Sequence, residues 1–146
     1  MFILLIFFLA YFLLFFRIQL LFVSVDGKNT IYTRHVRDGD LIEIGHVNSI
    51  YEKEVREVLR VNKGYMELID VITDSFGVRE YYRLEDEPKG RKWRSIKFIN
   101  SKGRNFYLKI DGREIDIRGY VGRSILVEVC KTCVLCTIVK RKELDS

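Results

Sequence analysis

The N-terminal segment constrains this chain more than any other feature. Residues 1–16 carry no charged side chain, and the apolar run continues past Arg17 as far as Val23. A helix over residues 1–23 would be about 34 Å long, and the hydrocarbon core of a bilayer is about 30 Å thick. A small domain could not cover a helix that is apolar on every face. The sequence therefore predicts a single-pass transmembrane anchor within residues 1–25, which contacts the lipid bilayer through residues 1–23.

The segment has the features of an anchor that is retained. A cleavable signal peptide carries basic residues before its apolar part and small residues before the cleavage site, and the sequence up to Ser24 has neither. Lys and Arg residues follow the segment and none precedes it, which by itself favours a domain in the cytoplasm. Because whole domains are often translocated regardless of flanking charge, this bias leaves the side of the membrane open.

Residues 26–146 are expected to form one β domain, since roughly 120 residues suffice for one compact core and not for two. The chain has 25 Lys and Arg against 20 Asp and Glu, a formal charge of +5, and both signs are interspersed. This pattern indicates a solvated surface and does not favour nucleic acid as a partner.

Short runs rich in Val, Ile, Tyr and Phe alternate with Gly-containing turns, and no long stretch keeps a helical period. The fold class expected is all-β, with a single antiparallel β sandwich or barrel-like domain after one transmembrane helix. Three Asp-Gly pairs, which begin at Asp26, Asp38 and Asp111, predict hairpin turns. The expected strands are residues 30–36, 40–47, 54–61, 65–72, 78–83, 92–99, 105–110, 114–119, 124–129 and 134–140.

All three cysteines lie in one C-x-x-C-x-x-C segment, at Cys130, Cys133 and Cys136. A metal site would need a fourth ligand, and the two histidines, His35 and His46, lie far away in the sequence. A disulfide would need a turn between the cysteines, because residues three apart in a strand are roughly 10 Å apart. Packed thiols are the leading interpretation, and no cofactor is expected. A thiol-based redox or metal-binding protein stays as the alternative function.

Basic residues surround Trp93, at Lys89, Arg91, Lys92, Arg94 and Lys97. Proteins that bind single-stranded nucleic acid display several aromatic side chains on one exposed platform, whereas the aromatics here have strand spacing and are expected in the core. Anionic lipid headgroups are a more natural partner for such a face. The serines lack the context of a catalytic nucleophile, and no phosphate-binding glycine loop is present, so no enzymatic activity is expected.

A candidate binding site lies where two expected strands end. The stretch from Gly45 to Val61 joins two strands through polar, charged and aromatic residues, and the segment around Ser75 follows after two strands. Polar groups, aromatic rings and a flexible glycine at strand ends are typical of a binding rim. The predicted ligand-binding residues are Asn48, Ser49, Tyr51, Glu57, Phe76 and Gly77.

The same stretch resembles a family of small β domains of unknown function that are associated with TAXI-type TRAP transporters. The family pattern has His-Ser-Val, then Pro-Val-x-Glu, and later Ser-Phe-Gly-Ala-Gly. This chain matches it at Ser49, Glu57 and Gly77. The resemblance implies an extracytoplasmic domain that is N-terminally anchored or secreted, with no established activity, and we adopt that location. Our leading hypothesis is that the predicted rim binds a small ligand or a transporter component.

The chain also departs from the family pattern. Asn48 stands in place of the histidine, Glu54 in place of the proline and Arg79 in place of the second glycine. His46 lies two positions before Asn48 and would share its face of a strand. A third hypothesis is an assembly domain that pairs through a sheet edge. The sequence leaves open the identity of the ligand, the oligomeric state and the redox or metal state of the cysteines.

Overall fold

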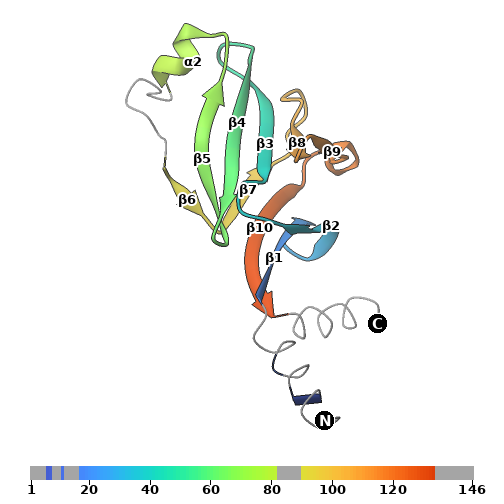
Figure 1. Ribbon diagram of the computed structural model, residues 1–146. Coiled ribbons are helices and arrows are strands. Elements are labelled where there is room, and N and C mark those ends of the chain that lie inside the picture. Colours follow the sequence, from blue (N-terminus) through green and yellow to red (C-terminus); the bar gives the residue numbers. More distant parts are fainter. Residues whose placement is uncertain (1–5, 8–10, 12–16, 82–89, 134–146) are drawn as a thin grey trace.

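The computed structural model describes residues 6–7, 11, 17–81 and 90–133 of the chain, which fold into two antiparallel β sheets (Figure 1). The strands are β1 Arg17–Val25, β2 Asn29–Val36, β3 Leu41–Asn48, β4 Lys53–Asn62, β5 Tyr65–Ile72, β6 Lys92–Trp93, β7 Ser95–Ile99, β8 Tyr107–Ile110, β9 Arg113–Ile115 and β10 Ser124–Cys133. The helices are α2 Phe76–Tyr81 and a 3-10 turn, η2, at Arg118–Tyr120. The expectation of an all-β fold is confirmed.

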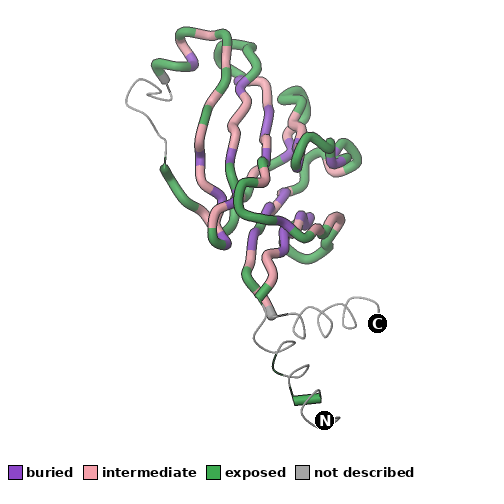
Figure 2. The backbone as a smooth tube through the Cα atoms, viewed as in Figure 1, coloured by how far each residue is buried: buried purple, intermediate pink, exposed green. Residues whose placement is uncertain are grey.

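The four-stranded sheet has the order β2-β1-β10-β7, and the six-stranded sheet has the order β6-β5-β4-β3-β8-β9. The chain crosses repeatedly between the two. At Arg94 it passes from β6 in one sheet to β7 in the other within a single residue. Both sheets contribute to one hydrophobic core, and Figure 2 shows buried residues in the strands of both. Leu21 and Val127 enter the core from the four-stranded sheet, and Ile42 and Leu59 enter it from the six-stranded sheet.

The structure corrects the predicted N-terminal helix from Arg17 onward. Residues 17–25 form β1, a central strand that pairs with β10 from Arg17↔Cys133 to Val25↔Ile125 and with β2 on its other edge. Leu20 and Leu21 point to opposite faces of β1 and both are buried. A central strand buried on both faces reads as a continuous apolar run, which periodicity cannot separate from the end of an apolar helix.

The first strand of the β domain therefore begins at Arg17, within the residues 1–25 that the sequence assigns to the anchor. Of the residues before β1, the structure describes Ile6, Phe7 and Tyr11, whose backbones are helical. The rest of the expected anchor lies outside the described residues. Within the part of the chain that is described, no helix has both the length and the apolar character needed to cross a bilayer.

The expected strands from 30–36 to 65–72 correspond to β2 through β5. The expected strand over 78–83 is wrong, because residues 76–81 form α2. Ser75 precedes this helix, and its Oγ accepts a hydrogen bond from the N–H of Val78 at 3.3 Å. Ser is a preferred residue at a helix N-terminus because its side chain satisfies a backbone donor of the first turn.

Two further predicted strands change in the structure. The expected strand over 92–99 is divided at Arg94 between the two sheets. The expected strand over 114–119 ends at Ile115 and is followed by η2, where the Oδ1 of Asp116 accepts a hydrogen bond from the N–H of Arg118 at 3.1 Å. The expected strand over 134–140 lies outside the described residues.

Two of the three Asp-Gly pairs form the predicted hairpins. Asp26 and Asp111 have φ of 53° and 50°, and they join β1 to β2 and β8 to β9. Asp38 instead precedes a crossing from β2 to β3 in the other sheet, so the hairpin predicted there is wrong. Its Oδ1 accepts hydrogen bonds from the Nε2 of Gln19 at 2.9 Å and from the N–H of Lys63 at 2.7 Å. These bonds connect the two sheets at the crossing.

Candidate functional site

The turn between β3 and β4 is held by the side chain of Asn48. Its Oδ1 accepts hydrogen bonds from the N–H groups of Ile50 at 2.9 Å and Tyr51 at 3.2 Å. Its carbonyl oxygen accepts a third from the N–H of Glu52 at 2.8 Å, and Glu52 takes a positive φ of 51°. Asn48 is buried at 7% exposure. The side chain of Asn48 therefore shapes the turn, as Asn side chains commonly do.

The turn and α2 meet through Tyr51 and Gly77. A Cβ placed on Gly77 would lie 2.6 Å from the Cε1 of Tyr51, so the tyrosine ring packs directly over this glycine. Val78 anchors the helix with a fully buried side chain. Phe76, the residue before Gly77, points outward and is 72% exposed. We call the β3–β4 turn and α2 together the turn–helix end of the domain (Figure 1).

Ser49 is linked to a segment that the sequence did not indicate. Its Oγ accepts a hydrogen bond from the Nη2 of Arg104 at 3.4 Å, and the carbonyl oxygen of Arg104 accepts one from the N–H of Val47 at 2.6 Å. The ring of His46 stacks on Phe106 with centroids 5.2 Å apart. Burial lowers the pKa of His46, and the charge of Arg104 lowers it further. Both effects favour the neutral form of the imidazole.

Glu57 lies away from the turn. The register pairs Asn48 with Lys53, so Glu57 is four residues further along β4, about 13 Å at the rise of a strand. It occupies the core-facing side of the sheet between Val55 and Leu59, where burial raises the pKa of its carboxyl group. The register places Ile44 opposite Glu57 on β3 and His46 diagonal to it.

The six predicted site residues thus fall into two groups. Asn48, Ser49, Tyr51, Phe76 and Gly77 gather at the turn–helix end, and Glu57 lies on the inner face of the sheet. His46 does share the face of Asn48, as the alternation along β3 requires. It lies between the turn and Glu57 along this face.

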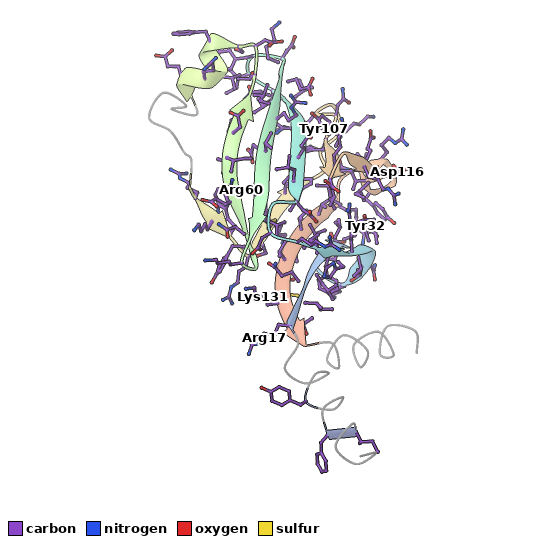
Figure 3. The ribbon with its side chains drawn as sticks, viewed as in Figure 1. Arg17, Tyr32, Arg60, Tyr107, Asp116 and Lys131 are labelled. Carbon is purple, nitrogen blue, oxygen red and sulfur yellow. The ribbon has the colours of Figure 1, made fainter. Side chains whose placement is uncertain are left out.

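The opposite face of the six-stranded sheet carries a contact that the sequence analysis missed. Tyr107 of β8 lies across β3 and donates a hydrogen bond from its OH to the Oε1 of Glu54 on β4 at 2.8 Å (Figure 3). A Cβ on Gly45, which β3 places beneath this ring, would lie 2.1 Å from the ring carbons. Burial and the bond to Glu54 raise the pKa of Tyr107 to about 12. A glycine within a strand was the available signal, because it often marks such a close approach.

The structure describes only part of the cysteine segment. β10 runs without a turn through Cys130 and Cys133, so these two residues lie roughly 10 Å apart along the strand and cannot bridge to each other. Cys136 lies outside the described residues. Among the residues that are described, no three His, Cys, Asp or Glu side chains are grouped as metal ligands. The side chain of Trp93 packs against the core and is not displayed on an exposed platform.

Comparisons with protein-family models, with curated proteins and with solved structures give no match to this chain. The resemblance to the TAXI-associated domains therefore stays a prediction from the residues at the turn–helix end and Glu57. The structure adds the local geometry of those residues: a fixed turn, a short capped helix, and an aromatic ring packed on a glycine.

Proposed function

We propose that this protein is a non-enzymatic, membrane-anchored domain that binds a partner protein with its turn–helix end. The observation that carries the proposal is the exposure of large apolar side chains there. Ile50 is 66% exposed, Tyr51 is 41% exposed and Phe76 is 72% exposed. Apolar side chains that gather on a surface in this way are typical of sites for other proteins.

The backbone that carries these side chains is fixed before any partner arrives. Asn48 holds the turn through two hydrogen bonds to its backbone, and Ser75 caps the helix. Tyr51 is kept in place by contact with Gly77. A surface that is already ordered loses little conformational entropy on binding, which favours affinity.

The turn–helix end also lies far from Arg17, where β1 begins. β4 extends ten residues from Lys53 at the turn to Asn62, about 30 Å, and β1 begins near the opposite end of the domain (Figure 1). Residues 1–16, if helical, would span about 24 Å, and Arg17 could extend its charged group toward the headgroups. An anchor of this kind would hold the turn–helix end away from the bilayer surface.

The partner we propose is a membrane or binding component of a TAXI-type TRAP transporter, on the extracytoplasmic side. This identity rests on the resemblance at Ser49, Glu57 and Gly77, and the exposed apolar residues supply the means of contact. A reporter of membrane topology fused after Ser146 tests the location. Activity of the reporter only in the cytoplasm would contradict it.

Site-specific crosslinking tests the contact in the intact membrane. A photo-crosslinking residue replaces Phe76 in the full chain, expressed with the TRAP components of the same genome. We expect an adduct with one transporter component. The same replacement at Val121, which is 52% exposed and far from α2 in the sequence, is the matched control and should give none. Equal adducts at both positions, or none at Phe76, would refute the proposed contact.

A further inference from the structure

A second feature lies at the opposite end of β4 from the turn–helix end. A pocket of about 280 Å³ opens where the first residue of β1, the β4–β5 turn, the β6–β7 crossing and the end of β10 come together. Four cationic side chains line it, from Arg17, Lys63, Arg94 and Lys131. Figure 3 shows Arg17 and Lys131 at this end of the molecule. We call it the basal pocket.

The positive charge of the basal pocket is only partly compensated. Among the described residues of its lining, Glu128 is the one acidic side chain, so four cations face one anion and these residues have a net charge of +3. The hydrogen bonds from Gln19 and from the backbone of Lys63 lower the pKa of Asp38 most. The nearby charges of Lys131 and Lys63 lower it further. Counting Asp38, the net charge is still +2.

None of the four cations is used in an ion pair with the residues that the structure describes. The ion pairs there involve other arginines, at Arg34, Arg56, Arg60, Arg118 and Arg123. The charge of a cation in an ion pair is already compensated by its counterion, whereas these four cations converge on a cavity. Convergent cations that outnumber the acidic groups around them are the arrangement that binds an external anion.

Two of the cationic side chains of the pocket are also held in place by contacts within the domain. The Nη2 of Arg94 donates a hydrogen bond to the OH of Tyr65 at 3.0 Å, and its guanidinium lies 5.1 Å from the centre of the tyrosine ring. A Cβ on Gly64 would lie 3.0 Å from the Cγ of Lys131, so the lysine stem packs over this glycine. A guanidinium held beside a hydroxyl, in a lining that also contains Lys63 and Lys131, offers several hydrogen-bond donors to a phosphate group.

The position of Arg17 in the chain favours a membrane lipid as the source of the phosphate. Arg17, which lines the pocket, is the first charged residue after the uncharged run of residues 1–16. A bilayer entered by that run brings its headgroups to Arg17. Cytoplasmic or extracytoplasmic leaflets that contain anionic lipid attract basic residues at this depth.

We propose that the basal pocket binds a phosphate group, and that this phosphate belongs to the headgroup of an anionic phospholipid. The phosphate chemistry rests on the pocket alone. The lipid source rests additionally on the proposed membrane anchor. Binding here is independent of the turn–helix end, so the crosslinking experiment can fail while this proposal holds, and the reverse.

The test compares two lipids on the full chain in detergent micelles. Native mass spectrometry counts bound phosphatidylglycerol against bound phosphatidylcholine, which is zwitterionic. We expect a preference for phosphatidylglycerol. The double variant Lys63→Gln/Lys131→Gln should weaken that binding roughly 30-fold, since each basic residue near an anionic surface contributes about a factor of five.

A matched control removes the same charge elsewhere. The variant Lys28→Gln/Lys102→Gln changes two exposed lysines that do not line the pocket and should leave the preference unchanged. A second arm titrates inorganic phosphate and follows its ³¹P line width. Pocket-dependent phosphate binding without any lipid preference would assign a soluble phosphate and overturn the lipid source. Absence of both signals, or equal loss in the two double variants, would overturn the pocket as an anion site.

Discussion

The two ends of this domain offer different chemistry to a partner. The turn–helix end exposes apolar side chains, Ile50 and Phe76, on a backbone fixed by side-chain hydrogen bonds. The basal pocket gathers cations from segments that are remote in sequence, such as Arg17 and Lys131. Apolar contact is insensitive to moderate salt, whereas exposed charge is screened over about 8 Å at physiological ionic strength. One small fold can therefore serve two partners that respond differently to conditions.

The largest expected change in stability comes from a substitution in the six-stranded sheet, which carries both ends. Gly45→Ala would force the ring of Tyr107 off its position and break its bond to Glu54. Overpacking of this kind costs about 1–3 kcal/mol. Thermal unfolding of the full chain in detergent should show a lower Tm. In a Tyr107→Ala background the added methyl has room, so the cost should largely disappear, and additive costs would show that the ring is not the obstacle.

The next largest change in stability is expected from a substitution at the turn–helix end. Asn48→Ala removes the acceptor for two backbone N–H groups and should lower the unfolding free energy by roughly 1–2 kcal/mol. Asn48→Asp keeps an oxygen in that position and should recover most of the loss. The alanine variant should also reduce crosslinking at Phe76 and leave lipid binding at the basal pocket unchanged. Loss of both activities would mean that the two ends are coupled.

A pH-dependent effect is expected from Glu57. Burial raises its folded-state pKa above the ordinary 4.5, so between these two values the folded protein binds more protons than the unfolded protein. Stability should consequently fall as the pH rises through this window. Glu57→Gln, which does not titrate, should gain stability over the native chain above the window and lose that advantage below pH 4.5. Parallel Tm curves for the two proteins would contradict this account.

The smallest effects are expected for the groups that we assign to binding. Phe76→Ser and the pair Lys63→Gln/Lys131→Gln change exposed side chains, so each should alter the unfolding free energy by no more than about 0.5 kcal/mol. Denaturant titration of the full chain measures this. Large destabilisation by either variant would assign its residues a structural role and remove the contrast between stability and binding.

Most of the β structure could be predicted from the sequence, because the signals involved are local. Alternation along Leu108 and Ile110 marks β8, and the Asp-Gly pairs at Asp26 and Asp111 mark two hairpins. The helix α2 was missed because six residues are too few for periodicity to separate a helix from a strand. The serine cap at Ser75 was the usable signal.

The grouping of the candidate site residues was predicted less completely, because it depends on contacts that local sequence signals do not report. Asn48, Tyr51 and Gly77 do meet, because short connections bring the turn and α2 together at one end of the strands. Glu57 was placed with them, although the β3–β4 register separates it by four residues from the Asn48 pair. Arg104, which contacts Ser49, comes from a distant loop that no local pattern connects to the turn.

The sequence by itself determined an antiparallel β domain with turns at Asp26 and Asp111, because each of these features depends on neighbouring residues alone. Only the tertiary structure decided that Arg17–Val25 is a strand, since an apolar run becomes a strand or a helix according to what it pairs with. The basal pocket is likewise a tertiary feature. Its cations converge only after β1 pairs with β10 and the β4–β5 turn packs beside them.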